Sequence, residues 1–205
     1  AAALANAANG ELSHYPRRPR DMSDNMYNLA QEGASSSNIA MTSGRMTLPM
    51  SIRMYLSDAD SGNRSRVGHR RWILYPTLYK IGFGQVEGYT ATRVIGGERN
   101  YSAKEYGVAW PAQNMPVEYF GADYAWSVSM GYKVDASKIK VTLTRKNDGK
   151  KWEFSQGKSD GVFYVDNDYY GQIGCIIFRP SSVKKYNADD AFQVDITGLE
   201  QGDVS

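Results

Sequence analysis

Residues 139–154 read IKVTLTRKNDGKKWEF and contain the clearest strand pattern in the chain. Apolar residues alternate with Lys and Thr over residues 139–144, as in a half-buried β-strand. Asn147-Asp148-Gly149 then supplies turn residues, after which Trp152 and Phe154 alternate in the same way. This stretch therefore predicts an antiparallel hairpin with one face in a core.

Short segments of the same kind recur through the second half of the chain. They are Trp126 with Val128, residues 162–165, residues 176–178, and Phe192 with Val194 and Ile196. About six or seven short strands at this spacing are typical of an antiparallel, immunoglobulin-like β-sandwich. We expect residues 108–205 to form such a domain and to fold alone, because about 100 residues suffice for a core.

The first half has helical periods instead. Residues 1–9 predict a helix closed by Gly10, a common C-cap residue. Ser23 is a suitable N-cap for a second helix. Thr47 followed by Leu48-Pro49 starts a third, with Met50, Met54 and Tyr55 spaced to share one face.

The remaining elements of the first half are shorter. Residues 66–74 predict a short helix that ends before Pro76. Residues 81–86 and 90–95 predict strands. Residues 1–107 should therefore form helices over a small sheet, so that the whole chain belongs to the α+β class.

The two halves also differ in charge. Residues 1–107 hold eleven Arg and two Lys against nine acidic residues, a balance of +4, whereas residues 108–205 hold two Arg and nine Lys against thirteen acidic residues, a balance of −2. Neither value indicates a nucleic-acid-binding protein. The change falls near residues 107–111, which we interpret as a linker.

Cysteine content and hydropathy set further limits. Cys175 is the only cysteine, so no intramolecular disulfide can form, and its apolar neighbours predict a buried, unreactive thiol. No apolar stretch reaches the roughly 20 residues of a membrane span. No signal-peptide pattern precedes the first helical segment, and we expect a processed or truncated product.

The chain has only two histidines, His14 and His69, and each lies in an arginine-rich segment. Imidazole titrates near neutrality and binds divalent metals, so these residues are the first candidates for a site. We expect the two rings to approach within roughly 8 Å, as metal or water bridging requires. Seven arginines lie in the same two segments: Arg17, Arg18, Arg20, Arg64, Arg66, Arg70 and Arg71.

Several blocks around these histidines resemble the bacterial branch of the CAP superfamily (cysteine-rich secretory proteins, antigen 5 and pathogenesis-related 1), also called SCP-like extracellular proteins. The resemblance covers roughly residues 1–107. It implies an αβα sandwich, here N-terminally incomplete, and an extracellular or cell-surface location after removal of a signal peptide. The blocks are Gly10-Glu11-Leu12-Ser13-His14-Tyr15-Pro16, Ser36-Ser37-Asn38-Ile39-Ala40, residues 58–63, Val67-Gly68-His69-Arg70-Arg71-Trp72-Ile73-Leu74-Tyr75-Pro76 and Gly82-Phe83-Gly84.

The resemblance also implies a cleft, because the family's central cleft holds two histidines and two acidic residues. By position His14 and His69 match the histidines, and Asp58 matches one acid, with Asp for Glu. The chain departs from the pattern at Ser37, where the second acid normally stands. Glu32 is nearby in the sequence but does not match the motif.

Three kinds of chemistry remain open for this cleft. His14 and His69, with Asp58, could hold Zn²⁺ with an open coordination position, although the missing acid and the nearby arginines disfavour a bound cation. Ser37 with His69 and Asp58 could form a hydrolytic arrangement, but no Gly-x-Ser-x-Gly motif accompanies Ser37. Alternatively, His69 is structural and its ring bonds to the backbone.

The arginines suggest an anionic ligand. Arg70, Arg71, Arg66 and Arg17 could bind a cell-wall polymer phosphate or a lipid headgroup, or simply pair with nearby carboxylates. In the second half, Tyr169-Tyr170 beside Asp166 and Asp168 could contact a sugar or an extracellular protein, or pack within its own loop.

Together these features favour a secreted, non-enzymatic binding module that requires no cofactor and has a His-containing cleft for a small or anionic ligand. A metal-dependent hydrolase that uses the same cleft, and a structural cell-surface adhesion domain, are the alternatives. No residue is assigned a catalytic role.

Overall fold

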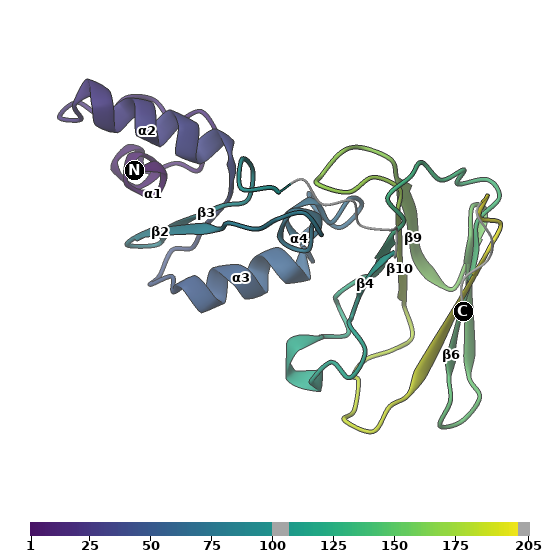
Figure 1. Cartoon of the computed structure of the whole chain (residues 1–205). Helices are drawn as coiled ribbons and strands as arrows, with labels where there is room; N and C mark the ends of the chain where they lie inside the picture. Colours follow the sequence, from purple (N-terminus) through teal and green to yellow (C-terminus); the bar gives the residue numbers. More distant parts are fainter. Residues whose placement is uncertain (100–106, 201–205) are drawn as a thin grey trace. The chain divides into compact units, whose positions relative to one another are not determined.

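A computed structural model describes residues 1–99 and 107–200 (Figure 1). The described residues form a mixture of helix and sheet, and every strand pair among them is antiparallel. It divides into two compact units, Ala1–Leu56 with Trp72–Ala103 and Ser57–Arg71 with Lys104–Ser205. No helix among the described residues is long and apolar enough to cross a bilayer.

The first unit is a three-stranded sheet with helices on both faces (Figure 1). Ile39 packs with alanines of α1 and α2, whereas the next residue, Ala40, packs with Tyr55 of α3. Successive strand residues point to opposite faces, so this pair separates the two helical layers. The elements are α1 (Ala2–Asn9), α2 (Asp24–Ser35), β1 (Ser37–Met41), α3 (Leu48–Ser57), β2 (Gly82–Val86) and β3 (Tyr89–Arg93), with strand order β1-β3-β2.

Three predicted helix boundaries in this unit are confirmed. Gly10 adopts the left-handed conformation (φ 67°) and closes α1. The Ser23 hydroxyl accepts the backbone N–H of Met26 at the start of α2. The Thr47 hydroxyl accepts the backbone N–H of Met50 at the start of α3.

Two details of the first unit differ from the prediction. The burial of α3 falls on Ser51 and Tyr55, while Met50 and Met54 are exposed, so the predicted face of Met50, Met54 and Tyr55 was wrong. Strand β1 was not predicted as a strand. All but its last residue are buried, because helices cover both faces of the sheet, and such a strand lacks the alternation that reveals a half-buried one.

The second unit contains two four-stranded antiparallel sheets that share one hydrophobic core. Ile176 and Phe178 of one sheet pack in the same cluster as Leu143, Phe154 and Ile196 of the other. The strand orders are β4-β5-β10-β9 and β11-β6-β7-β8. The strands are β4 (Val108–Trp110), β5 (Trp126–Ser129), β6 (Lys140–Arg145), β7 (Lys151–Ser155), β8 (Lys158–Ser159), β9 (Gly161–Asp166), β10 (Cys175–Pro180) and β11 (Phe192–Thr197), and a short 3-10 helix, η1 (Val117–Tyr119), joins β4 to β5.

The hairpin expected at residues 139–154 is confirmed as β6 paired with β7, with Val141 opposite Phe154 and Leu143 opposite Trp152. These four inward residues are nearly inaccessible, as the alternation predicted. The expected linker at residues 107–111 was wrong at Val108–Trp110, which form β4 at the edge of a sheet. A change in charge composition marks surface chemistry, whereas strand pairing depends on the backbone.

The segment Ser57–Arg71 belongs to the second unit although it lies far from it in sequence. The expected division into 1–107 and 108–205 assigns the same segment to the first domain. It includes most of a short helix, α4 (Gly68–Ile73). Its contacts within the second unit carry most of the candidate site.

Candidate functional site

The segment Ser57–Arg71 is held in an unusual backbone conformation. Asp58 and Val67 have positive φ angles of 41° and 43°, a region that a β-branched residue rarely adopts. Such conformations persist only where surrounding contacts impose them. Val67 is fully buried against Ala125, Cys175 and Ile177, which supply those contacts.

Asp58 and His69 form the central pair of this segment. The His69 Nδ1 lies 2.8 Å from Asp58 Oδ1, and Asp58 Oδ2 accepts the backbone N–H of Arg70 at 3.0 Å. Asp58 is 2% exposed, while the His69 side chain is 24% exposed. Because the carboxylate is the acceptor, Nδ1 carries the proton and the lone pair of the neutral ring lies on Nε2.

Arg70 is buried and bound inside the unit. Its guanidinium donates to the carbonyl of Ala125 at 2.7 Å, the hydroxyl of Ser127 at 2.9 Å and the carbonyl of Ser57 at 2.8 Å. Burial lowers the pKa of Arg70 to about 10, against the opposing effect of Asp58. The side chain therefore fastens the segment to β5 and the loop that precedes it.

Arg71 uses every donor of its guanidinium within the same unit. It pairs with Asp166 at 2.8 Å and donates to the carbonyls of Arg66, Asp168 and Gln172. The sequence suggested an anion-binding role for Arg70 and Arg71, but both side chains are about 1% exposed and bind acceptors of their own chain. Their geometry is that of structural anchors.

Tyr170 completes the anchor. The Arg71 guanidinium lies 5.1 Å from the centre of its ring and that of Arg66 lies 5.8 Å away. A Cβ on Gly68 would meet the same ring at 3.0 Å, so this contact needs the glycine. Of the two readings of the Tyr169-Tyr170 pair, loop packing applies to Tyr170, while Tyr169 is 59% exposed.

Two of the four predicted cleft residues lie in the first unit. His14 is exposed, and its Nδ1 lies 2.8 Å from the Ala34 carbonyl, which must accept, so Nε2 again carries the lone pair. Ser37 is buried at the start of β1 and lies opposite Arg93 in the sheet. Asp58 and His69 lie together in the second unit, and the approach of the two histidine rings stays a prediction.

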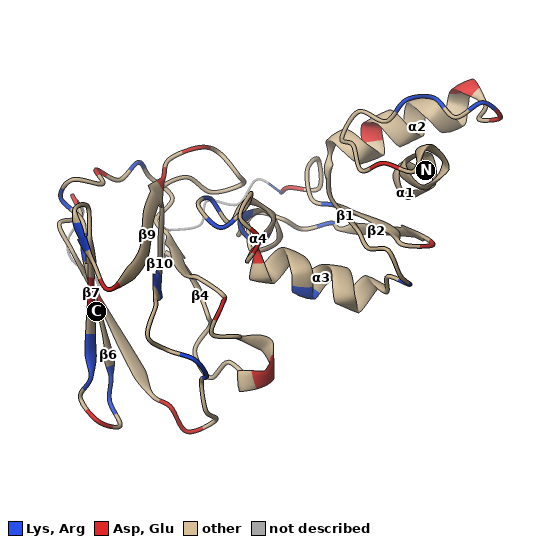
Figure 2. Ribbon diagram, turned by 180° about the vertical axis from the view of Figure 1, so that it is seen from behind, with Lys and Arg blue, Asp and Glu red and all other residues tan. Residues whose placement is uncertain are grey.

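The other two arginines predicted to bind anions are exposed. Arg66 is on the loop that leads into α4, where basic residues stand out in Figure 2. Arg17 lies 3.4 Å from Glu11 in the first unit, an exposed pair that water screens strongly. Arg66 and Arg17 thus remain accessible, unlike Arg70 and Arg71.

The residues that the structure describes include no group of three or more His, Cys, Asp or Glu side chains arranged to hold a metal. Both Asp58 oxygens are used inside the segment, so this carboxylate orients His69 rather than extending a ligand set. Cys175 is fully buried, as predicted, and burial raises the pKa of its thiol. When the rings are neutral, the Nε2 atoms of the histidines are the ligands that would suit Zn²⁺.

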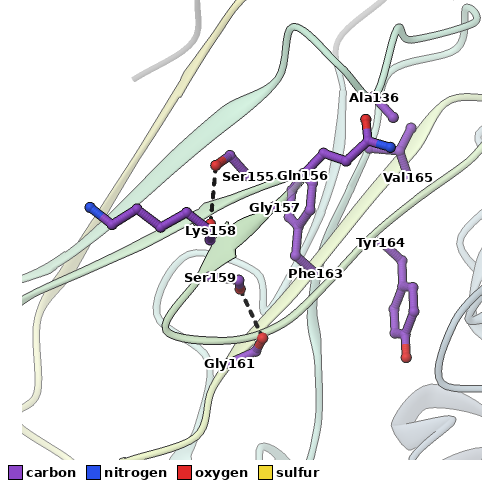
Figure 3. Close-up of a pocket in the computed structure, with 10 residues that line it drawn as sticks. All are labelled: Ala136, Ser155, Gln156, Gly157, Lys158, Ser159, Gly161, Phe163, Tyr164 and Val165. Carbon is purple, nitrogen blue, oxygen red and sulfur yellow. Dashed lines mark hydrogen bonds between the residues drawn. The ribbon is translucent and has the colours of Figure 1, made fainter.

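An open pocket of about 490 Å³ lies elsewhere in the second unit, between the β7–β8 turn and β9 (Figure 3). The Ser155 hydroxyl donates to the Lys158 carbonyl at 3.0 Å, and the Ser159 hydroxyl donates to the Gly161 carbonyl at 2.8 Å. The Lys158 ammonium pairs with Glu153 at 3.1 Å. These polar groups therefore serve the turn and do not converge on a ligand position.

Comparisons with known proteins return no matching family model, curated protein or solved structure. The site therefore rests on its own geometry. The sequence identified Asp58 and His69, and it also singled out Asp166 and Tyr170, but not their link to Arg71. Nothing in the local pattern indicates a pairing across 95 positions.

Proposed function

We propose that this chain is an extracellular, CAP-like binding module that recognises an anionic ligand without catalysing its conversion. Support comes from the sequence blocks around His14 and His69, and from a first unit with helices on both faces of a small sheet. In this proposal the first unit is the CAP-like αβα layer, and the second is an immunoglobulin-like sandwich.

One observation carries the proposal. The segment Ser57–Arg71 is fixed by two buried arginines, and its side chains His69 and Arg66 remain partly or fully exposed. Asp58 fixes the orientation of the His69 ring at 2.8 Å. A positioned imidazole and an exposed guanidinium on the same segment suit a phosphate or carboxylate ligand.

The binder is preferred to the hydrolase because Ser37 replaces the second acid of the resembled cleft, and because its hydroxyl is buried in the first unit. If His69 acted as a general base, the hydrolysis would also need a general acid to protonate the leaving group. Asp58 already accepts the Nδ1–H of His69 and the N–H of Arg70, so it is a positioning group.

The proposal is tested by retention of the protein on phosphate-bearing cell-wall material. Replacing Arg17 and Arg66 with Gln should reduce retention several-fold, and added salt should do the same, because exposed charges are screened over about 8 Å at physiological ionic strength. Replacing His14 and His69 with Gln should leave most retention intact. Release of soluble products that stops in the histidine variant would overturn the proposal in favour of a hydrolase.

A metal-dependent hydrolase is the second candidate, and one observation favours it. Each histidine donates its Nδ1–H to an oxygen, His14 to the Ala34 carbonyl and His69 to Asp58, as metal-ligating histidines usually do. If Zn²⁺ binds there, Asp58→Asn should weaken its affinity about tenfold or more in a calorimetric titration. An unchanged affinity would exclude His69 as a ligand.

A further inference from the structure

A second cavity, of about 520 Å³, lies at one end of the two-sheet unit, away from the β7–β8 turn. Pro111 and Met115, after β4, form one side, and residues 186–188 and 190–192, which lead into β11, form the other. This volume is in the usual range for a small-molecule site. None of the interactions described for the Asp58–His69 pair involves these residues.

Four aromatic side chains contribute to the wall of this cavity: Phe120, Trp126, Tyr186 and Phe192. Trp126 meets Phe120 and Phe192 at interplanar angles of 77° and 65°, with ring centres 5.4 Å apart in both pairs. Tyr186 meets Phe192 at 81°. Rings that meet edge to face form a concave wall rather than a flat platform.

The polar groups of this wall are few and fixed. The Trp126 indole N–H donates to the Tyr186 hydroxyl at 2.9 Å, which holds both rings in place. Burial raises the pKa of Tyr186, so its hydroxyl stays neutral at physiological pH. Trp126 and Phe192 are only half-buried, which leaves aromatic surface available to an occupant.

Asp190 is the only charged side chain among the described residues that line the cavity. Its Oδ2 accepts the backbone N–H of Asn187 at 2.8 Å, which fixes the carboxylate at the rim. Two cations act on this region from outside the lining. Asp148 binds Arg145 through hydrogen bonds of 2.9 and 2.5 Å and, with a smaller contribution from Asp190, raises the pKa of Arg145. Arg179, whose charge acts on Tyr186, donates to the Asp123 carbonyl at 2.9 Å. The net character of the site is therefore aromatic and acidic.

We propose that this cavity binds a small organic cation with a quaternary ammonium group. The ring quadrupoles of Trp, Tyr and Phe attract a cation that carries no strongly held water, and methyl groups on nitrogen supply apolar contact with the same rings. Asp190 adds a formal counter-charge at the rim. An anionic ligand is disfavoured because no Lys or Arg side chain is among the described lining residues.

Choline is the probe, and 3,3-dimethylbutan-1-ol is its uncharged analogue of nearly the same shape. The full chain is titrated with each, and the indole N–H resonance of Trp126 is followed by NMR. Choline should bind with a dissociation constant of about 1 mM, and the uncharged analogue at least tenfold more weakly.

Two variants test the charge and the ring separately. Asp190→Asn keeps the acceptor for Asn187 and should weaken choline binding about fivefold to tenfold, whereas Asp189→Asn, at an exposed neighbour outside the cavity, should leave it unchanged. Phe192→Leu keeps apolar volume and should weaken choline about tenfold without affecting the analogue. A native amide spectrum confirms that each variant is folded.

Equal binding of choline and its uncharged analogue would overturn the proposal and leave a merely apolar cavity. Binding of choline that neither Asp190→Asn nor Phe192→Leu alters would place the ligand elsewhere and would also overturn it. Failure of both probes to shift the Trp126 resonance at concentrations of about 50 mM would exclude the site altogether. These results do not depend on retention on cell-wall material. The anion-binding proposal and the proposal for this cavity are therefore tested independently.

Discussion

The two units bury very different side chains. The clusters of the first unit are small and rich in alanine: Ala2, Ala3, Ala34 and Ala91 surround Ile39, and Ala5 and Ala30 surround Met22. The second unit has a large cluster that includes Trp152, Phe154 and Phe178, and a smaller one around Val67. Because stabilisation grows with the apolar area buried, the second unit should be the more stable of the two.

The units differ in the same way in their ion pairs. In the first unit the Arg93–Glu32 and Arg18–Asp24 pairs are largely exposed. In the second unit Arg71 pairs with Asp166 while its own side chain is 1% exposed. The ion pairs of the first unit therefore lie at its surface, whereas the second unit has a charged side chain in its interior.

The largest effect is expected from Arg70→Met. The change leaves Asp58 without its buried cation and leaves the Ala125 and Ser57 carbonyls without their donor. Removing one member of a buried charged network costs about 3–5 kcal/mol of unfolding free energy. Urea unfolding followed by tryptophan fluorescence measures it, since Trp110, Trp126 and Trp152 lie in the second unit.

The matched control for that experiment is Arg66→Met, at an exposed position of the same segment. Its effect should stay within about 0.5 kcal/mol. Equal effects of the two substitutions would mean that the burial of Arg70 does not contribute to the free energy of unfolding. The buried charges of the second unit would then stabilise it no more than exposed charges do.

Tyr55 gives the first unit a response to alkaline pH. Its side chain is 2% exposed and donates to the Asn38 carbonyl at 3.1 Å, and burial raises its pKa to about 12. The unfolded chain loses this proton near pH 10, so the folded state binds more protons between about pH 10 and 12 and stability falls as pH rises through that window. The loss contributed by Tyr55 should approach about 2–3 kcal/mol.

The measurement is urea unfolding followed by helical circular dichroism, because α1, α2 and α3 lie in the first unit. Tyr55→Phe removes the titrating group and should flatten the response between pH 10 and 12, after a constant loss of about 1 kcal/mol for the hydrogen bond. An identical slope in the variant and the natural chain would assign the response to other groups.

How far the sequence predicts this fold depends on the kind of contact. The β6–β7 hairpin and the caps at Gly10 and Ser23 are correct because short-range patterns determine them. Strand β1 is missed because burial on both faces removes its periodicity. The CAP-like and immunoglobulin-like identities of the units stay predictions.

The candidate site shows the same limit. His69 and Asp58 are eleven positions apart, so a motif of ordinary length can include both residues and predict that they share a site. The roles of Arg70 and Arg71 depend on Ser127, Asp166 and Gln172, which lie 57 to 101 positions away. A cluster of arginines in a sequence indicates charge, but only the tertiary contacts show that two of them are interior.

Gly68→Ala should produce an intermediate loss in the second unit. The new Cβ would lie 3.0 Å from the Tyr170 ring, which must shift away from its contact with Arg71. Crowding of this kind costs about 1–3 kcal/mol. The same fluorescence measurement reports this loss. Gly44→Ala, in the first unit, is the control because a Cβ there meets nothing within 4 Å, and its effect should be near zero when unfolding is followed by helical circular dichroism.

The smallest effect is expected from Glu32→Gln in the first unit. Glu32 and Arg93 are 2.9 Å apart, but their side chains are 58% and 46% exposed, so water and salt screen the pair. The loss of unfolding free energy should be below about 0.5 kcal/mol and should vanish when the ionic strength is raised to about 1 M. Asp166→Asn is the counterpart in the second unit, and it should cost about 2–3 kcal/mol at either ionic strength, because the buried Arg71 would lose its carboxylate partner. Measured side by side in urea with both optical probes, the two substitutions should differ at least fourfold at low salt and more at high salt. A loss above about 1 kcal/mol for Glu32→Gln would show that an exposed ion pair stabilises the first unit. The contrast between exposed pairs in the first unit and a buried arginine in the second would then have no consequence for stability.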